Sequence, residues 1–176
     1  MPAERFVAQL NEQIGHEFAA HQQYLAVAVY YDDLTMPQMA GFFYRQALEE
    51  RGHAMMMVQY LLDQGAKVAI PGVEAPEISF ADVEAPVSLA LAQEKRVTEQ
   101  INQLTKTARE EADFASDQFM QWFIKEQVEE VATMSDLLNV VSRSKDNIEA
   151  IEDYVIREQG GEGGDTTAPP EAGAGA

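Results

Sequence analysis

The sequence predicts an all-α protein built as a four-helix bundle. Along four long stretches, apolar residues recur at steps of three and four, which is the period of an amphipathic helix. Outside one irregular stretch, residues 66–84, the sequence does not show the alternating apolar and polar pattern typical of strands. A length of 176 residues with 46% apolar side chains suits one soluble domain with a sizeable core. Together these features favour helices packed on helices around a single core.

The boundaries of the helices follow from local signals. Asp32, Asp33 and Pro37 separate the first helix from the second, because proline suits the first turn of a helix. Gly65 is a natural stop after the second helix, and Asp113 is a plausible N-cap for the fourth. The expected helices cover residues 4–31, 37–64, 86–108, 113–141 and, as a short fifth helix, 147–158.

Two stretches lie outside this helical pattern. Residues 66–84 contain Pro71 and Pro76 and form a long connection between the second and third helices. Residues 159–176 are rich in Gly, Ala and Pro and contain no Lys or Arg, a composition typical of a disordered tail. The expected organisation is therefore one bundle domain, residues 1–158, followed by a disordered acidic tail, residues 159–176.

Composition excludes several classes of function. With 12 Lys+Arg against 30 Asp+Glu the formal net charge is −18, which argues against a nucleic-acid binder and against docking on anionic membranes. The absence of cysteine removes disulfides, thiolate metal knuckles and a thiol nucleophile. The N-terminus has no signal-peptide core, and no apolar run approaches transmembrane length. We expect a cytoplasmic protein.

Polar residues interrupt the apolar stripe of each long helix at positions that should face the core. These residues are Glu17, Glu50, His53, Glu94, Gln127 and Glu130. Glu50 and His53 are three residues apart and so leave the same helix face, and Gln127 and Glu130 repeat that spacing.

The long connection decides whether these residues can meet. Residues 66–84 can stretch to roughly 60 Å, which exceeds the length of the bundle. If the connection crosses the bundle, the third helix runs parallel to the second. A rise of about 1.5 Å per residue then places all the interrupting residues within about two turns of one another. Without the crossing, Glu94 would miss the cluster.

Carboxylates and an imidazole converging in a core would be very unfavourable if they were charged and empty, because burial and mutual repulsion both oppose ionisation. Four carboxylates are balanced by two divalent cations. A donor set rich in oxygen, with one nitrogen and no sulfur, favours Fe²⁺ or Mn²⁺ over structural Zn²⁺. The sequence therefore predicts a di-metal centre inside the bundle.

The chain resembles a non-haem bacterial ferritin of the di-iron family, of the actinobacterial type, over residues 4–158. The resemblance is carried by Asn11-Glu12-Gln13-x-x-x-Glu17 with Tyr24, by Ala47-Leu48-Glu49-Glu50-Arg51-Gly52-His53-Ala54, by Glu94, and by Gln118-Phe119-x-Gln121-Trp122-Phe123-x-x-Glu126-Gln127-x-Glu129-Glu130. It implies the ferritin-like bundle, with a long crossover and a short fifth helix.

The resemblance of these residues also implies a function as a ferroxidase, which oxidises Fe(II) with dioxygen or with peroxide. It further implies a homo-oligomeric cage of 24 subunits that stores the ferric mineral. Glu17, Glu50 and His53 would hold the first iron, and Glu50 would bridge to a second iron held by Glu94, with Gln127 and Glu130 close by. Glu49, Glu126 and Glu129 match a third iron site. Tyr24 and Trp122 match aromatic residues that supply electrons, although ordinary core packing would also explain them.

Departures from related families narrow the expectation. Bacterioferritins carry Glu-x-x-His where this chain has Gln127-x-x-Glu130, and a haem-ligating Met at the position of Arg51, so we expect no haem. His21 is expected to pack or to form a local hydrogen bond, and His16 to lie at the surface or an interface. The alternatives are a di-iron oxidase or peroxidase of the rubrerythrin kind, and a structural bundle that self-associates through exposed Tyr, Phe and Met residues.

Overall fold

The computed structural model describes residues 2–158 and 165–174, and this part of the chain contains helices and no strand. The helices are α1 (Glu4–Asp33), α2 (Pro37–Asp63), α3 (Ala85–Glu110), α4 (Phe114–Ser144) and α5 (Ile148–Glu158). The predicted all-α bundle is confirmed, with the helix ends within a few residues of those expected. In the described ranges, no helix combines the length and apolarity needed to span a bilayer.

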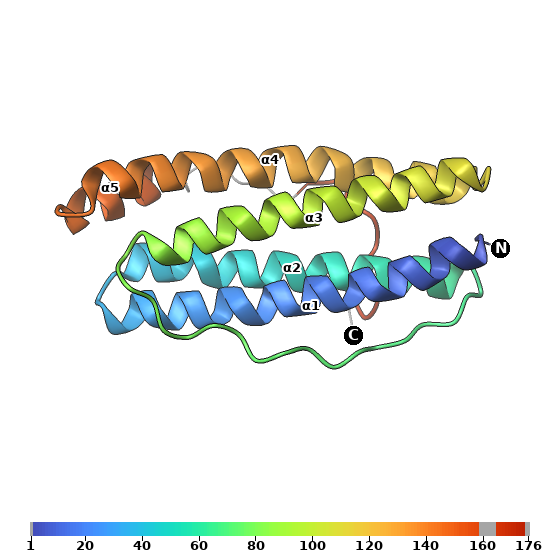
Figure 1. The fold of residues 1–176 in the computed structure, drawn as a ribbon, viewed down its shortest axis with the longest axis horizontal. Coiled ribbons are helices and arrows are strands. Elements are labelled where there is room, and N and C mark those ends of the chain that lie inside the picture. Colours follow the sequence, from blue (N-terminus) through green and yellow to red (C-terminus); the bar gives the residue numbers. More distant parts are fainter. Residues whose placement is uncertain (1, 159–164, 175–176) are drawn as a thin grey trace.

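The connection between α2 and α3 crosses the full length of the bundle. Figure 1 shows residues 66–84 running outside the helices, from the end of α2 to the opposite end of the molecule, where α3 begins. As a result, α2 and α3 run in the same direction and α1 and α4 run in the other. α1 packs along α2, α3 packs along α4, and α1 contacts α3. The parallel arrangement that the buried acids required is therefore present.

Local chemistry fixes the helix boundaries. Pro37 occupies the first turn of α2, where its missing N–H costs no hydrogen bond. The Asp113 carboxylate caps α4 by accepting a hydrogen bond of 3.1 Å from the Ser116 backbone N–H. Gly65 follows α2 with φ +65°, a left-handed conformation that glycine adopts without steric cost.

The apolar core of the described residues is divided into two clusters, one toward each end of the bundle. One cluster contains Tyr24, Tyr31 and Phe43 together with residues of α5, and the other contains Phe6 and Met57 together with residues of α4. Full burial of a large apolar side chain stabilises a fold by roughly 1.5–3 kcal/mol. The two clusters therefore fix the four helices α1, α2, α3 and α4 relative to one another on both sides of a polar layer, which is described below.

The short helix α5 fastens the end of the bundle. Ile151 and Val155 are buried in the cluster that contains Tyr24. The Glu152 carboxylate accepts hydrogen bonds of 2.9 Å from the backbone N–H groups of Gln38 and Met39, at the start of α2. A carboxylate at a helix N-terminus satisfies otherwise unpaired donors and is favoured by the helix dipole.

Residues 165–174 lie against α2 and α4. The Ala172 backbone N–H donates to the Met55 carbonyl at 3.1 Å, and the Trp122 indole N–H donates to the Asp165 carboxylate at 3.0 Å. Ala168 and Ala172 pack on the cluster that contains Phe6. The composition of residues 159–176 predicts disorder. Of these, residues 159–164 and 175–176 lie outside the described part of the chain, and residues 165–174 make the contacts given above.

Candidate metal centre

The polar layer between the two apolar clusters contains every residue that interrupts the helix stripes. All six side chains are at least 95% buried: the exposed fractions are 1% for Glu17, 1% for Glu50, 3% for His53, 0% for Glu94, 3% for Gln127 and 5% for Glu130. They come from α1, α2, α3 and α4. The fold therefore brings to one level the residues that the sequence singled out.

Glu17, Glu50 and His53, which we call the trio, lie closest together. His53 Nδ1 is 3.5 Å from Glu50 Oε2 and 3.9 Å from Glu17 Oε2. One ligand atom from each residue lies within 4.8 Å of the others, and among the described residues this trio is the group that meets that criterion for a metal ion. The Gln13 amide donates to Glu17 Oε1 at 2.8 Å, so Glu17 Oε2 is the oxygen on the His53 side.

Glu94 is held by hydrogen bonds from two neighbouring helices. The Tyr24 hydroxyl of α1 donates to Glu94 Oε1. On α4, Gln127 Oε1 accepts from the Thr98 hydroxyl at 3.0 Å, and the Gln127 side chain also bonds Glu94. Because the amide oxygen is engaged by Thr98, the amide nitrogen is the group that faces Glu94. These bonds orient the carboxylate without adding a positive charge beside it.

Each carboxylate of the layer has one oxygen that accepts no hydrogen bond from the described residues, although His53 Nδ1 lies 3.5 Å from that oxygen of Glu50 and 3.9 Å from that of Glu17. In the described part of the chain, the Oε2 atoms of Glu17, Glu50, Glu94 and Glu130 are buried and accept no hydrogen bond. A buried polar atom left unpaired costs about 1–3 kcal/mol, and more when it is charged. Four such oxygens beside an imidazole form a donor set that suits a divalent ion such as Fe²⁺ or Mn²⁺. The donor set fits the predicted iron ligands on these grounds.

The electrostatics of the layer oppose ionisation. Burial, followed by repulsion from Glu94 and other acids, raises the pKa of Glu50 and of Glu130 well above the usual range. Burial also raises the pKa of Glu94, to about 7, while the hydrogen bond from Tyr24 lowers it. The pKa of His53 is lowered by burial, against the attraction of Glu17 and Glu171. The side chains therefore favour uncharged forms until a cation enters.

Aromatic residues flank the layer on two sides. Tyr24 is fully buried and contacts Phe43 at a ring distance of 5.7 Å. Trp122 lies edge-to-face on the His53 ring, with centroids 5.6 Å apart and an interplanar angle of 71°. Phe123 packs on the same imidazole at 5.9 Å. Both aromatic residues that the resemblance matches to electron donors adjoin a carboxylate or imidazole of the layer, and their role as donors stays a prediction.

The three residues expected to form a third iron site lie on the α2–α4 side. Glu49 and Glu126 are close enough to Glu130 to raise its pKa by repulsion. Glu49 also accepts a hydrogen bond from the Gln46 amide, and Glu129 lies 3.7 Å from the Lys125 ammonium group. This arrangement places acids next to Glu130, and their role as ligands stays a prediction.

Sequence patterns missed the residues that support the layer. The amides of Gln13 and Gln46 donate to the carboxylates of Glu17 and Glu49, and the Thr98 hydroxyl donates to the Gln127 amide oxygen. The available signal was the position of these three residues one helical turn from Glu17, Glu50 and Glu94. His21, expected to pack or to form a local hydrogen bond, is bonded through Nδ1 to the Ala47 carbonyl of α2 at 2.6 Å, so its hydrogen bond joins two helices. His16 is exposed, as expected.

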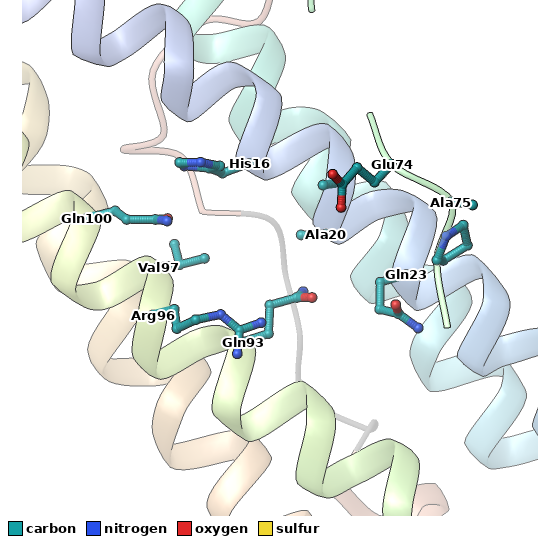
Figure 2. A pocket seen from close by; sticks show the side chains of 11 residues that line it. His16, Ala20, Gln23, Glu74, Ala75, Gln93, Arg96, Val97 and Gln100 are labelled. Atoms are coloured by element: carbon teal, nitrogen blue, oxygen red, sulfur yellow. The ribbon is translucent and has the colours of Figure 1, made fainter. Parts of the chain in front are cut away.

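A polar cleft opens over the α1–α3 side of the layer. Figure 2 shows Gln93, Arg96 and Gln100 of α3 facing His16, Ala20 and Gln23 of α1, with Glu74 and Ala75 of the crossover at its edge. The cleft has a volume of about 290 Å³. Because His16 and Gln93 directly precede Glu17 and Glu94 in the chain, this cleft lies beside the polar layer.

Comparisons with known proteins agree on one family. The model of the ferritin-like domain family matches residues 7–144. The chain is 51% identical over 169 residues to ferritin BfrB of Mycolicibacterium smegmatis, covering 96% of this chain and 93% of the relative. It is 35% identical over 151 residues to the bacterial non-heme ferritin of Staphylococcus aureus, covering 86% and 91%. The open-pore ferritin structure of Archaeoglobus fulgidus superposes with a TM-score of 0.84 at 30% identity, covering 88% and 96%.

Proposed function

The chain belongs to the ferritin family, and we propose that it oxidises Fe(II) to Fe(III) with dioxygen, or with peroxide, in the buried polar layer and stores the ferric product inside a cage of 24 identical subunits. The expected compartment, the cytoplasm, stays a prediction. Iron is the substrate and the cargo in this proposal, and the protein contributes positions, charge and protons.

The observation that carries the proposal is the set of carboxylate oxygens on Glu17, Glu50, Glu94 and Glu130 that accept no hydrogen bond within the described ranges. A bundle that used these acids only for packing would leave buried acceptors unpaired, at a cost that a solvated face avoids. This disfavours the structural-bundle alternative. A rubrerythrin-like oxidase is disfavoured because α4 offers Gln127 and Glu130 instead of a second Glu-x-x-His pair.

The two irons would bind side by side. The trio offers two carboxylate oxygens and one nitrogen to the first Fe(II). Glu50, on the boundary between the trio and Glu94, would bridge to the second Fe(II), which Glu94 and Glu130 would hold with Gln127 nearby. Two ferrous ions then each give one electron to dioxygen, which takes up two protons and becomes hydrogen peroxide.

Protons for this step are stored in the layer itself. Burial and the neighbouring acids raise the pKa values of Glu50 and Glu130, which favours the protonated carboxyl groups in the iron-free protein, and a bound cation would favour their ionised forms. Iron binding and oxidation would therefore exchange protons for metal charge in a site whose side chains are at least 95% buried. Glu49, Glu126 and Glu129 would accept a third iron next to Glu130.

Size-exclusion chromatography after addition of excess Fe²⁺ in air tests oxidation, storage and assembly together. We expect ferric absorbance to co-elute with protein at several hundred kilodaltons. Glu50→Ala should abolish the fast oxidation and keep the cage, whereas the matched control Glu99→Ala, at an exposed position of α3, should keep both. Iron that precipitates while the protein elutes near its subunit mass of 19.5 kDa would contradict the proposal.

A further inference from the structure

The chain has one tryptophan, and residues 165–174 bond directly to it. Trp122 Nε1 donates to Asp165 Oδ2 at 3.0 Å. The other carboxylate oxygen, Oδ1, accepts from the Thr167 backbone N–H at 2.8 Å and from the Thr167 hydroxyl at 2.6 Å. The Lys125 ammonium group lies 3.6 Å from Oδ2. The carboxylate is therefore held in one orientation, with Oδ2 aimed at the indole.

The same indole contacts the polar layer through His53. Its ring stands edge-to-face on His53 with a centroid distance of 5.6 Å. His53 belongs to the trio, so Trp122 is a single side chain in contact with both the candidate metal centre and the tail. An electron that leaves the indole has only a short distance to travel to iron bound by His53.

A second contact keeps the tail close to α2. The Ala172 N–H bonds the Met55 carbonyl at 3.1 Å, and Glu171 lies over Gly52, which is buried. A Cβ added at Gly52 would sit 3.2 Å from Glu171 Oε1, tighter than most contacts of real Cβ atoms. Glycine at this position leaves room for the Glu171 carboxylate over α2, one residue before His53.

Asp165 is a charged group at neutral pH. Hydrogen bonds from Thr167 and then from Trp122 hold the pKa of its carboxyl well below the usual range. A carboxylate that accepts from an indole N–H stabilises positive charge on that indole, because a hydrogen bond with one ionised partner strengthens further when both partners are charged.

We propose that Asp165 is a positioning residue for Trp122 as an electron donor: its carboxylate fixes the indole N–H and stabilises the radical cation formed when Trp122 gives one electron to the oxidant at the iron centre. The inference rests on the proposed iron oxidation. The two Fe(II) ions of the polar layer reduce dioxygen to hydrogen peroxide, and reduction of that peroxide to two waters takes two further electrons and two further protons; a third Fe(II) and Trp122 each supply one of these electrons. The indole radical cation then regains an electron from a further Fe(II).

Freeze-quench electron paramagnetic resonance tests the proposal on the full-length protein loaded with Fe²⁺ and mixed with dioxygen. Ring-deuterated tryptophan labels only Trp122, because the chain has no other tryptophan, so an isotope-sensitive signal identifies the radical. Asp165→Asn keeps an acceptor for the indole and removes the charge. We expect the radical yield per iron oxidised to fall about tenfold, the factor that corresponds to losing one charge-assisted hydrogen bond.

Matched variants separate charge from tail docking. Asp165→Glu should restore the radical yield, and Asp153→Asn, on the exposed side of α5, should leave it unchanged. Tryptophan emission of the metal-free protein reports whether the indole stays covered in each variant. An unchanged yield in Asp165→Asn, or iron oxidation with no tryptophan radical in the wild type, would overturn this inference. Absence of fast iron oxidation in the wild type would instead overturn the proposed function.

Discussion

Replacing Glu94 by Gln should stabilise the metal-free protein, and should do so more at high pH than at low pH. Glu94 is fully buried, and burial raises its pKa from 4.5 to about 7. Because the folded-state pKa lies above the unfolded-state value, folding favours the protonated carboxyl group. The contribution of the protonated Glu94 to the free energy of unfolding is complete below pH 4.5 and is lost as the pH rises through about 7. Gln is neutral throughout and keeps an oxygen that accepts the Tyr24 hydroxyl.

The shift sets the size of the effect. A rise from 4.5 to about 7 corresponds to about 3 kcal/mol of stability that the wild type loses between acid and alkaline pH and the variant retains. For a domain of this size, that difference amounts to about 6–12 °C in the melting temperature. His53 has a lowered pKa and therefore opposes the trend, because its contribution is lost as the pH falls. It titrates in both proteins and cancels in the difference.

Differential scanning calorimetry in a chelating buffer, at steps from pH 4.5 to 8.5, measures this difference. Glu99→Gln, at an exposed position of α3, is the matched control and should track the wild type. Saturating Co²⁺, which does not react with oxygen as Fe²⁺ does, should reverse the order, because the wild type then has a carboxylate to offer the cation. A melting difference that stays constant across the pH range would refute the assignment of Glu94 as a buried acid held for a metal.

Three further outcomes follow from single contacts. Asp113→Ala removes the cap from the Ser116 N–H and should cost about 1 kcal/mol in urea unfolding. Tyr24→Phe removes the hydroxyl that donates to Glu94, and because this bond lowers the pKa of Glu94, the variant should have a higher pKa there. Co²⁺ titrations should therefore show binding that is weaker than in the wild type, with a larger loss at pH 6 than at pH 8. Gly52→Asp places a second carboxylate against that of Glu171 and should displace residues 165–174 and shift the emission of the single tryptophan to longer wavelength, whereas unchanged emission would contradict the described docking.

Much of the fold could be predicted because periodicity reports burial directly. The apolar stripes gave the helices, and the acids within them required a crossover of residues 66–84 that the structure contains. Asp113 was identified as a cap because its chemistry is local. In each case the evidence lies within a few residues of the feature, or in a spacing that an α-helix converts into a shared face.

Other features could not be predicted because they depend on contacts between distant segments. Nothing local marks Asp165 as the partner of Trp122, since the two are 43 residues apart and the composition around Asp165 indicates disorder. Gln13 and Gln46 are ordinary polar residues in sequence, and only the packed bundle shows that they are buried beside carboxylates. The role of Gly52 becomes visible only when a chain segment lies on it.

The two halves of the polar layer have unequal donor sets, and this inequality suits a protein that must release what it binds. The trio combines carboxylates with an imidazole nitrogen, whereas the other half, Glu94, Gln127 and Glu130, offers only amide and carboxylate groups. Borderline ferrous iron is held more firmly where an imidazole contributes. In the proposed reaction the second half is therefore the weaker one. Burial, followed by the charges of Glu94, Glu49 and Glu126, raises the pKa of Glu130, so this carboxyl group favours its protonated form and a cation must displace the proton. In the proposed reaction, a cation that leaves Glu130 would next meet the carboxylates of Glu49 and Glu126 on the α2–α4 side, and their negative charge would favour its movement away from the weaker half.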